Sequence, residues 1–494
     1  MPRKIKIFDT TLRDGEQTPG VALTADKKTE IARALDELKV DIIEAGFPAS
    51  SDGDFKSVKT IANLGLDATV CGLARALKPD IDKCIDADVH LVHTFISTSP
   101  QHLKYQMGKT EEEVYAMAVS AVDYVKDHGI DCLFSPMDAT RSNVDYLKKV
   151  CIGVQGAGAK IINIPDTVGQ MYPHAMYDLI KEMRKVITVD IDVHCHNDFG
   201  MAVANTLASV EAGANQVQVA VNGLGERAGN ADLEQVVMAL EILYGRKTRI
   251  KTENIYKTSK LVERMTGIRV MPNFPIVGDN AFAHESGIHT HGVLKKAETF
   301  EPTGLTPDMV GAKRKLVLGK HVGIHGVEAK LKELGIDVSK EQLKEITNKV
   351  KSLGDLGKRV VEDDLAAIAD DLLGRDSKEK RFVELADLEL NLKFGRKPVA
   401  SVDILVNGKR KKATEEGVGP VDAALNAIRG AIGEKDIRLD EYHLDAITGG
   451  SNALADVTIR VSKGEKVTMA RGVHEDVVMA SVIAFLNGVN RLIK

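Results

Sequence analysis

Two histidines separated by a single residue, His194 and His196 in the segment IDVHCHND, are the first feature of this sequence that could do chemistry. Their neighbours favour a β-strand, and side chains two residues apart on a strand point to the same face, with Cα atoms about 7 Å apart. Two imidazoles at this spacing can bind one metal ion. The alternative interpretation is a pair of core histidines that are satisfied by hydrogen bonds.

Asp14 and Asn230 could complete such a site from distant parts of the chain. Asp14 follows the first apolar segment, and Asn230 ends the glycine-rich segment NGLGERAGN (222–230). Two imidazoles, one carboxylate and one amide suit Mg²⁺, Mn²⁺ or Zn²⁺ and leave positions for substrate oxygens. The segment lacks the GK[ST] ending of a phosphate-binding P-loop, so without the neighbouring ligands it would be interpreted as a plain loop.

Further polar residues could act on a bound substrate. Arg13 is adjacent to Asp14, and a guanidinium beside a metal can stabilise a developing enolate or alkoxide oxygen, although a surface ion pair is the alternative. Thr167 could donate its hydroxyl to a carboxylate, or it could be a turn or cap residue. The segment HESGIHTHG leaves a second metal site, a general base and structural groups as interpretations of its histidines, which are His284, His289 and His291.

Short β-rich apolar runs that alternate with amphipathic helical patterns must position these residues. This alternation continues to about residue 245, and eight β-then-α units predict a closed (β/α)8 barrel, the TIM barrel. A doubly wound open sheet is the alternative, which the lack of an early GxGxxG disfavours. The predicted strands are 5–12, 41–46, 69–74, 91–96, 130–136, 161–167, 191–197 and 216–223.

A closed barrel would bring the polar candidates together, because barrel active sites lie at the carboxyl ends of the strands. Asp14 follows the first predicted strand, and the two histidines of HCH close the seventh. The other polar residues in or directly after predicted strands are His93, Ser135, Thr167, Asn222 and Asn230. We therefore expect one polar cluster at one end of the barrel.

The chain is too long for one hydrophobic core, and its pattern predicts three parts: a barrel (1–270), a helical linker region (271–378) and a C-terminal α+β domain (379–494). The linker region contains predicted helices at 327–335 and 340–354, and the charged stretch 374–382 separates it from the last part. In that last part the predicted strands include 385–394, 398–408 and 454–464, and the predicted helices are 419–433 and 474–493.

Composition excludes several classes of function. A formal net charge of −5 gives no general attraction to nucleic acid or to anionic membranes, and no uninterrupted apolar run approaches the length of a membrane span. The five cysteines are scattered without CxxC spacing, which predicts reduced thiols in a cytoplasm instead of a disulfide framework. The expected partners are therefore small molecules.

Four segments in order, FDTTLRDGEQTPG, HCHND, NGLGERAGN and AFAHESGIH, resemble the metal-dependent acyltransferase family of 2-isopropylmalate, citramalate and homocitrate synthases. The resemblance covers nearly the whole chain. It implies a Claisen-type condensation of a 2-oxo acid with acetyl-CoA as the co-substrate, followed by thioester hydrolysis. It also implies a divalent metal ion with Asp14, His194, His196 and Asn230 as ligands.

The resemblance implies a role for each of the other candidates. Arg13 would stabilise oxyanion charge, and His289 would enter the active site of the partner subunit. The predicted substrate-binding residues are Arg13, His93, Ser135, Asn163 and Thr167. Many family members have glutamate at Met137 and tyrosine at Phe300. These departures leave Asp138, Glu226 and His289 as alternatives for the group that removes the acetyl proton, and the predicted catalytic residues are Arg13, His289 and Glu226.

Segments 46–49, 93–100 and 163–169 resemble the members that take 2-oxoisovalerate in leucine biosynthesis. Pyruvate or 2-oxoglutarate as acceptor, a lyase reaction, and a catalytically silent small-molecule-binding paralogue are the alternatives. The C-terminal part resembles the family's allosteric domain, which implies leucine as effector and a homodimer or higher oligomer. Its alternative is a dimerisation domain that has lost effector binding.

Overall fold

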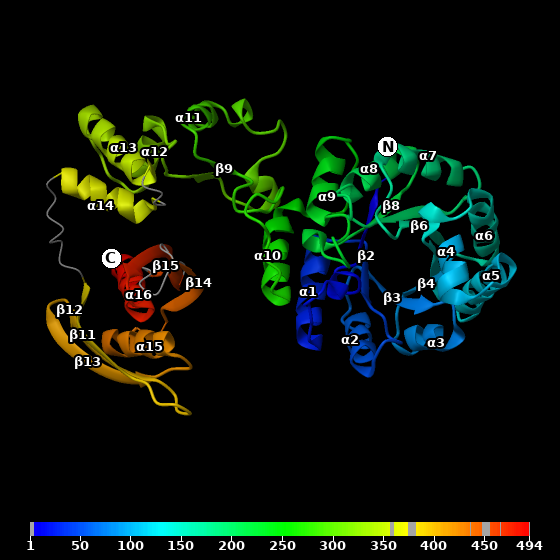
Figure 1. The fold of residues 1–494 in the computed structure, drawn as a ribbon, viewed down its shortest axis with the longest axis horizontal. Coiled ribbons are helices and arrows are strands. Elements are labelled where there is room, and N and C mark those ends of the chain that lie inside the picture. The colour runs from blue at the N-terminus through cyan, green and yellow to red at the C-terminus, as the bar shows by residue number, and fades with distance from the viewer. Residues whose placement is uncertain are drawn as a thin grey trace. The chain divides into compact units, whose positions relative to one another are not determined.

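The chain forms two compact units in the computed structural model, one of Met1–His284 with Lys296–Lys315 and one of Glu285–Lys295 with Leu316–Lys494. The structure describes residues 4–355, 360–373, 382–434, 436–446, 455–464 and 466–493. Figure 1 marks the elements along the chain. The predicted boundaries near residues 270 and 378 stay predictions.

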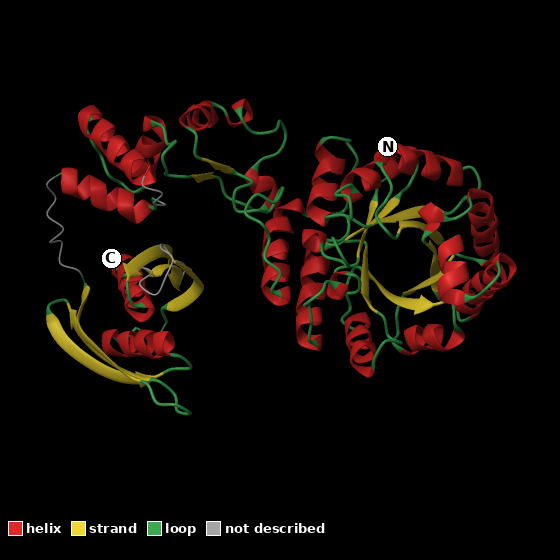
Figure 2. Cartoon of the chain, in the orientation of Figure 1, coloured by secondary structure: helices red, strands yellow, loops and turns green. Residues whose placement is uncertain are grey.

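Eight parallel strands form the centre of the first unit, in the order β7-β6-β5-β4-β3-β2-β1-β8. Where β7 and β8 meet, the Asn215 amide donates to the Ile191 carbonyl at 3.0 Å, so the sheet curves into a nearly closed barrel. Figure 2 shows these strands as a ring with helices outside it. The strands are β1 (Lys6–Asp9), β2 (Ile42–Gly46), β3 (Thr69–Arg75), β4 (Leu91–Ser97), β5 (Asp131–Met137), β6 (Ile161–Asp166), β7 (Asp190–Cys195) and β8 (Gln216–Val219).

Helices follow the strands, and side-chain caps fix where several of them begin. The Thr24 hydroxyl accepts from the Lys27 amide at the start of α1, and Thr110 and Glu113 form a reciprocal capping box on α5. The predicted (β/α)8 fold is thus confirmed. The helices are α1 (Ala25–Leu38), α2 (Asp52–Ala62), α3 (Lys78–Asp86), α4 (Pro100–His102), α5 (Glu111–Asp127), α6 (Val144–Ala157), α7 (Pro173–Met183), α8 (Ala202–Ala212), α9 (Leu233–Ile242) and α10 (Ile255–Thr266).

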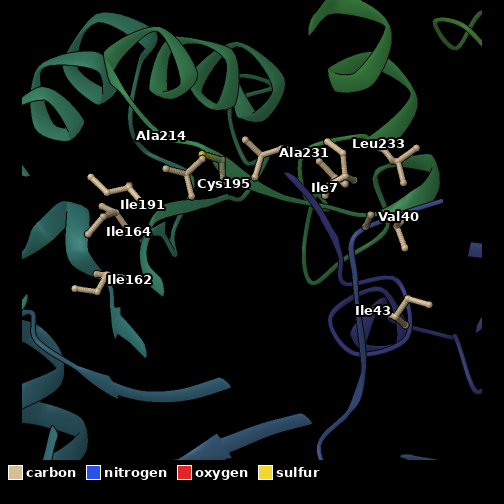
Figure 3. Packing of buried hydrophobic residues seen from close by; sticks show 14 of the residues in the cluster. Ile7, Val40, Ile43, Ile162, Ile164, Ile191, Cys195, Ala214, Ala231 and Leu233 are labelled. Carbon is tan, nitrogen blue, oxygen red and sulfur yellow. The ribbon is translucent and has the colours of Figure 1, made fainter. Parts of the chain in front are cut away.

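Alternate residues of each strand face the helices or the barrel interior. The outward set, which includes Ile162, Ile164 and Ile191, belongs to the large apolar core between strands and helices (Figure 3). The inward set begins with an apolar layer made of Phe8, Ile42, Cys71, Leu91, Leu133 and Ile161. Two residues further along four of these strands, the inward positions are polar, namely Glu44, His93, Ser135 and Asn163, and Asp192 of β7 pairs in register with Asn163. The strand period therefore places polar groups above an apolar base.

Helices dominate the region between the barrel and the C-terminal domain, as predicted. After the short strands β9 (Ala283–His284) and β10 (Lys315–Leu316), the helices α12 and α13 occupy the two segments that the sequence pattern indicates. Of the predicted linker 374–382, residues 374–381 lie outside the described residues. The helices of this region are α11 (Gly287–Lys295), α12 (Ile324–Glu333), α13 (Lys340–Asp355) and α14 (Glu362–Leu372).

The C-terminal domain packs two antiparallel three-stranded sheets against two helices around its own core. The predicted elements β11 (Val383–Asn391), β12 (Val399–Val406), β15 (Ala455–Lys463), α15 (Pro420–Ile432) and α16 (Val477–Leu492) are confirmed. The additional strands are β13 (Lys409–Glu416), β14 (Arg438–Ala446) and β16 (Lys466–His474). β13, with the sequence KRKKATEE, is exposed along almost its whole length and therefore carries no apolar alternation.

The predictions about cysteines and membranes can be compared with the structure directly. All five cysteines are free and buried, in agreement with the predicted reduced thiols. Within the described ranges, no helix combines the length and the apolar character that crossing a membrane requires.

Candidate active site

The closed barrel brings Asp14 together with His194 and His196, which come from opposite ends of the chain segment that forms it. The Thr10 carbonyl accepts the amides of Arg13, Asp14 and Gly15, and this turn after β1 holds the carboxylate in place. Oδ2 of Asp14 lies 3.1 Å from His194 Nε2 and 3.8 Å from His196 Nε2, and the two Nε2 atoms are 3.1 Å apart. Three buried ligand atoms therefore converge on one point.

The electrostatics of these groups suit cation binding. Burial raises the pKa of Asp14, but Arg13 and the two histidines outweigh it and hold that pKa well below its usual range. Burial, together with the neighbouring His194, lowers the pKa of His196 to about 3. Near neutral pH, Asp14 is thus ionised and His196 neutral, which are the forms that bind a metal.

Asn230 offers a fourth ligand, because its backbone forms a β-bridge with His196. Its side chain is only 2% exposed, yet neither its amide oxygen nor its nitrogen has a partner within the described part of the chain. A Cβ on Gly225 would come within 2.7 Å of this amide, so the glycine leaves room for the Asn230 side chain. Buried polar groups without a partner are costly, and a bound cation would satisfy the amide oxygen. The residues present therefore fit a divalent ion.

Arg13 lies beside the three converging groups and is anchored by Glu44. Its Nε donates to Glu44 Oε2 at 2.6 Å, and its Nη1 lies 3.1 Å from Asp14 Oδ2. Burial lowers the pKa of Arg13, but the Glu44 and Asp14 carboxylates outweigh burial and raise it, so the guanidinium stays charged. Burial likewise raises the pKa of Glu44, but Arg13 and His93 bring it below its ordinary value. Sequence reasoning missed Glu44, although a lone carboxylate in the apolar strand IIEAG was an available signal.

His93, Ser135 and Asn163 continue this network across β4, β5 and β6. His93 Nδ1 lies 2.6 Å from Glu44 Oε1, and its Nε2 lies 2.6 Å from Ser135 Oγ. Asn163 Nδ2 donates to Ser135 Oγ at 2.7 Å, and its buried Oδ1 has no partner among the residues described. Burial lowers the pKa of His93, which favours a neutral ring that donates to Glu44 and accepts from Ser135. The free acceptor of this predicted substrate-binding trio is therefore the Asn163 oxygen.

Thr167 directly follows β6, and other residues hold it on two sides. Its hydroxyl oxygen accepts the Asp138 amide at 2.9 Å, and its carbonyl accepts from Arg227 Nη2 at 2.9 Å. The hydroxyl proton of Thr167 can still be donated to a ligand. By contrast Asn222, also predicted at this rim, exchanges two hydrogen bonds with Ser259 of α10.

The three candidates for a general base differ in their contacts and exposure. Three hydrogen bonds of 2.6–2.9 Å from Arg141 engage the Asp138 carboxylate. Glu226 is exposed on the loop after β8, and His289 is exposed on α11 in the second unit. The catalytic roles of Glu226 and His289 therefore stay predictions.

Met137 and Phe300, which depart from the family pattern, lie in different surroundings, and so do the remaining histidines. Met137 is the last residue of β5, whereas Phe300 is 41% exposed in the segment after α11. His284 Nε2 lies 3.2 Å from Glu301 Oε1, which favours the structural interpretation of this histidine. The side chain of His291 lies outside the described residues.

Comparison with known proteins places this geometry in a family. The HMGL-like family profile matches residues 4–262, the homocitrate synthase post-HMGL domain-like profile matches 276–358, and the LeuA allosteric (dimerisation) domain profile matches 359–493. Among curated relatives, the probable 2-isopropylmalate synthase of Methanosarcina acetivorans is 55% identical over 100% of this chain and 96% of its own length.

Two proteins of Methanocaldococcus jannaschii are also similar over nearly their full length. Its 2-isopropylmalate synthase is 54% identical over 100% of this chain and 95% of its own length. Its (R)-citramalate synthase is 47% identical over 99% of both chains. These matches confirm the resemblance found in the sequence motifs. The chain therefore belongs to the family of 2-isopropylmalate, citramalate and homocitrate synthases, with an HMGL-like catalytic barrel.

Proposed function

We propose that this chain is a condensing acyltransferase that joins acetyl-CoA and 2-oxoisovalerate to give 2-isopropylmalate and CoA, the step that commits carbon to leucine. The converging Asp14, His194 and His196 beside Arg13 carry this proposal. The acceptor is inferred from relatives. Archaeal proteins named 2-isopropylmalate synthase are 52–55% identical over the full length, whereas proteins named citramalate synthase are 47–48% identical.

Asp14, His194, His196 and Asn230 are the residues that would hold a divalent ion. When bound, such an ion polarises the oxo group of the acceptor and fixes the acceptor for attack. The mixed nitrogen and oxygen donor set suits Mn²⁺, Mg²⁺ or Zn²⁺. Cys195, between the two histidines, belongs to the outward core, and burial raises the pKa of its thiol to about 12. Thiolate ligation therefore plays no part in the proposed site.

Arg13 and Thr167 would act directly on the acceptor. A charged guanidinium that Glu44 fixes from one side can stabilise negative charge as it develops on an oxygen beside Asp14. The Thr167 hydroxyl would donate to the acceptor's carboxylate while Asp138 and Arg227 hold Thr167 in place. The Asn163 amide oxygen would accept from a bound water or substrate group near the acceptor side chain.

We assign removal of the acetyl proton to His289 of the partner subunit. His289 is exposed on α11 and belongs to a different unit from the ligand candidates, and the C-terminal profile is described as a dimerisation domain. Glu226 is the second candidate, because it is exposed on the same loop as Asn230. A homodimer is part of this proposal, since His289 would act across the interface.

The C-terminal domain supports a proposed leucine effector. A groove of about 1060 Å³ lies between α15 and β14. Val421, Leu425 and Leu439 supply apolar lining, while Asp422 and Arg429 supply charges of both signs. A zwitterionic amino acid with a branched apolar side chain matches this combination.

An acceptor screen tests the proposed function. Purified enzyme with acetyl-CoA and a divalent metal is given 2-oxoisovalerate, pyruvate or 2-oxoglutarate, and free CoA is measured with a thiol reagent. We expect kcat/KM for 2-oxoisovalerate to exceed that for pyruvate by roughly tenfold or more, as one or two methyl groups in an apolar pocket allow. A preference for pyruvate would reassign the chain to citramalate synthesis. An inert wild type beside an active Met137→Glu, Phe300→Tyr double variant would favour the silent-binder alternative.

A further inference from the structure

Arg227, in the loop between β8 and α9, connects three loops at the rim of the barrel. Its Nε and Nη2 each lie 2.8 Å from a carboxylate oxygen of Asp198, which follows β7. Nη2 also donates to the carbonyl of Thr167, which follows β6, at 2.9 Å. Arg227 itself has φ 58°, a left-handed conformation that a non-glycine residue adopts only when its surroundings hold it there.

Arg227 and its partners lie near three of the predicted site residues along the chain, namely Thr167, His196 and Asn230. Asp198 is two residues beyond His196, and Arg227 is three residues before Asn230. The loop after β6 packs tightly on Asp198, since a Cβ on Gly169 would lie 2.4 Å from Asp198 Oδ2. One guanidinium thus links the loops that carry Thr167, His196 and Asn230.

Thr167 depends most directly on this link. Its hydroxyl oxygen is held by the Asp138 amide, and Arg141 in turn holds the Asp138 carboxylate. Its carbonyl is held by Arg227. With the side chain fixed from one loop and the peptide from another, the threonine hydroxyl keeps one direction. Without Arg227, the peptide after Thr167 can rotate while the Asp138 contact remains.

We propose that Arg227 is a positioning residue that orients Thr167 toward the carboxylate of the 2-oxo acid, so that Arg227 sets the affinity for the acceptor. This inference rests on the proposed function. In this proposal, Arg227 does not itself contact the substrate. The planar guanidinium of Arg227 offers two donors, Nε and Nη2, in a fixed geometry. A lysine at this position could not bind both Asp198 oxygens and the Thr167 carbonyl in the same way.

The exposure of the Arg227–Asp198 pair makes the proposal testable. The Arg227 side chain is 40% exposed and that of Asp198 is 24% exposed. Ion pairs with this exposure contribute little to folding stability, so removing the guanidinium should leave the protein folded. An effect on acceptor binding would then reflect the orientation of Thr167 and not a loss of fold.

The test compares Arg227→Gln and Arg227→Lys with wild type in the full-length enzyme. We expect the KM for the 2-oxo acid to rise roughly tenfold to a hundredfold in Arg227→Gln, as small misplacements of a binding group do, and to rise less in Arg227→Lys. The kcat and the KM for acetyl-CoA should change less than the acceptor KM. Arg410→Gln is the matched control, because Arg410 is also an exposed arginine paired with an aspartate, its Nε contacting both carboxylate oxygens of Asp403 in the C-terminal domain.

Hydrogen–deuterium exchange provides a readout that does not depend on turnover. Amides of residues 166–171 should exchange faster in Arg227→Gln than in wild type, while the melting temperature stays unchanged. Unchanged exchange together with an unchanged acceptor KM would overturn the proposal, as would an equal rise in the KM for acetyl-CoA. If wild type uses none of the oxo acids, the proposed function fails, whereas the exchange measurement still decides whether Arg227 orients this loop.

Discussion

The two ends of the barrel both carry charged side chains, but these charges differ in burial and in the partners that surround them. At the amino ends of the strands, a cavity of about 420 Å³ is lined by Lys6, Asp131, Lys160 and Asp190 among others. Lys6 Nζ lies 3.0 Å from Asp190, and the lysine side chain is 48% exposed. Water therefore solvates the Lys6 ammonium, while the Asp190 carboxylate also accepts from the Asn215 side-chain amide.

At the carboxyl ends of the strands, the charged side chains are buried and are paired with other protein groups. The side chains of Arg13, Asp14 and Glu44 are 12%, 3% and 0% exposed, and their charges compensate one another. The shifted pKa values of Asp14 and His196 occur at this end, as do the Asn163 amide oxygen and the Asn230 side-chain amide, which have no partner among the described residues. The comparison teaches that a hollow with charges is not by itself a site. Buried charge with unsatisfied polar atoms beside it is the stronger indication.

The largest expected effect comes from removing a converging ligand atom. Asp14→Ala and His194→Ala should each lower CoA release by about a thousandfold or more, because the acceptor is then neither polarised nor fixed. The measurement is the initial rate with acetyl-CoA and 2-oxoisovalerate at saturating metal. Asp190→Ala, at the opposite end of the barrel, is the control and should keep at least half of the wild-type rate. Equal losses in Asp190→Ala and Asp14→Ala would remove the distinction between the two ends.

Disturbing the anchor of Arg13 should have the next largest effect. Glu44→Gln removes the charge that holds the guanidinium, and we expect kcat to fall by roughly tenfold to a hundredfold, less than the loss for a group that itself stabilises developing charge. The bound metal should remain, since Glu44 is not among the ligand candidates. Metal analysis by mass spectrometry alongside steady-state kinetics checks both parts. Loss of metal with activity would show that Glu44 supports the ligands and not Arg13.

Asp9, at the carboxyl end of β1, should make stability depend on pH. Burial raises its pKa from its ordinary value of 3.8 to about 7, against hydrogen bonds from Thr11. Between about pH 4 and pH 7 the folded state thus binds more protons than the unfolded state, so this residue's contribution to stability falls as the pH rises. Asp9→Asn should remove up to about 4 kcal/mol of the pH-dependent fall in the free energy of unfolding between pH 4 and pH 7. Melting temperatures at pH 5 and pH 7.5 measure the change, and an identical pH dependence in both proteins would contradict the assignment.

The smallest effect is expected at the amino end. Lys6→Ala removes a half-exposed partner of Asp190 and should change the free energy of unfolding by less than about 1 kcal/mol, with activity unchanged. Denaturant unfolding and the acceptor assay test this expectation. A strong loss of activity in Lys6→Ala would mean that the cavity at the amino end takes part in function after all.

Much of the barrel and the centre of the site could be predicted from the sequence, because both follow from local periodicity. Apolar runs of strand length indicate the barrel, and its closure then brings Asp14 to the two histidines. Glu44 and Arg227 could not be assigned in this way, since their importance depends on contacts with residues far along the chain. β13 was missed for a different reason. Its side chains face solvent, so its pairing with β12 leaves no apolar pattern in the sequence.

A calorimetric titration of metal-depleted enzyme with Mn²⁺ tests the central claim most directly. We expect one site per chain in wild type, the same stoichiometry in Arg13→Lys, and no measurable binding in Asp14→Ala or His194→Ala. Mn²⁺ binding that persists unchanged when the Asp14 carboxylate is removed would contradict the claim, because the three converging atoms could then not be the metal site.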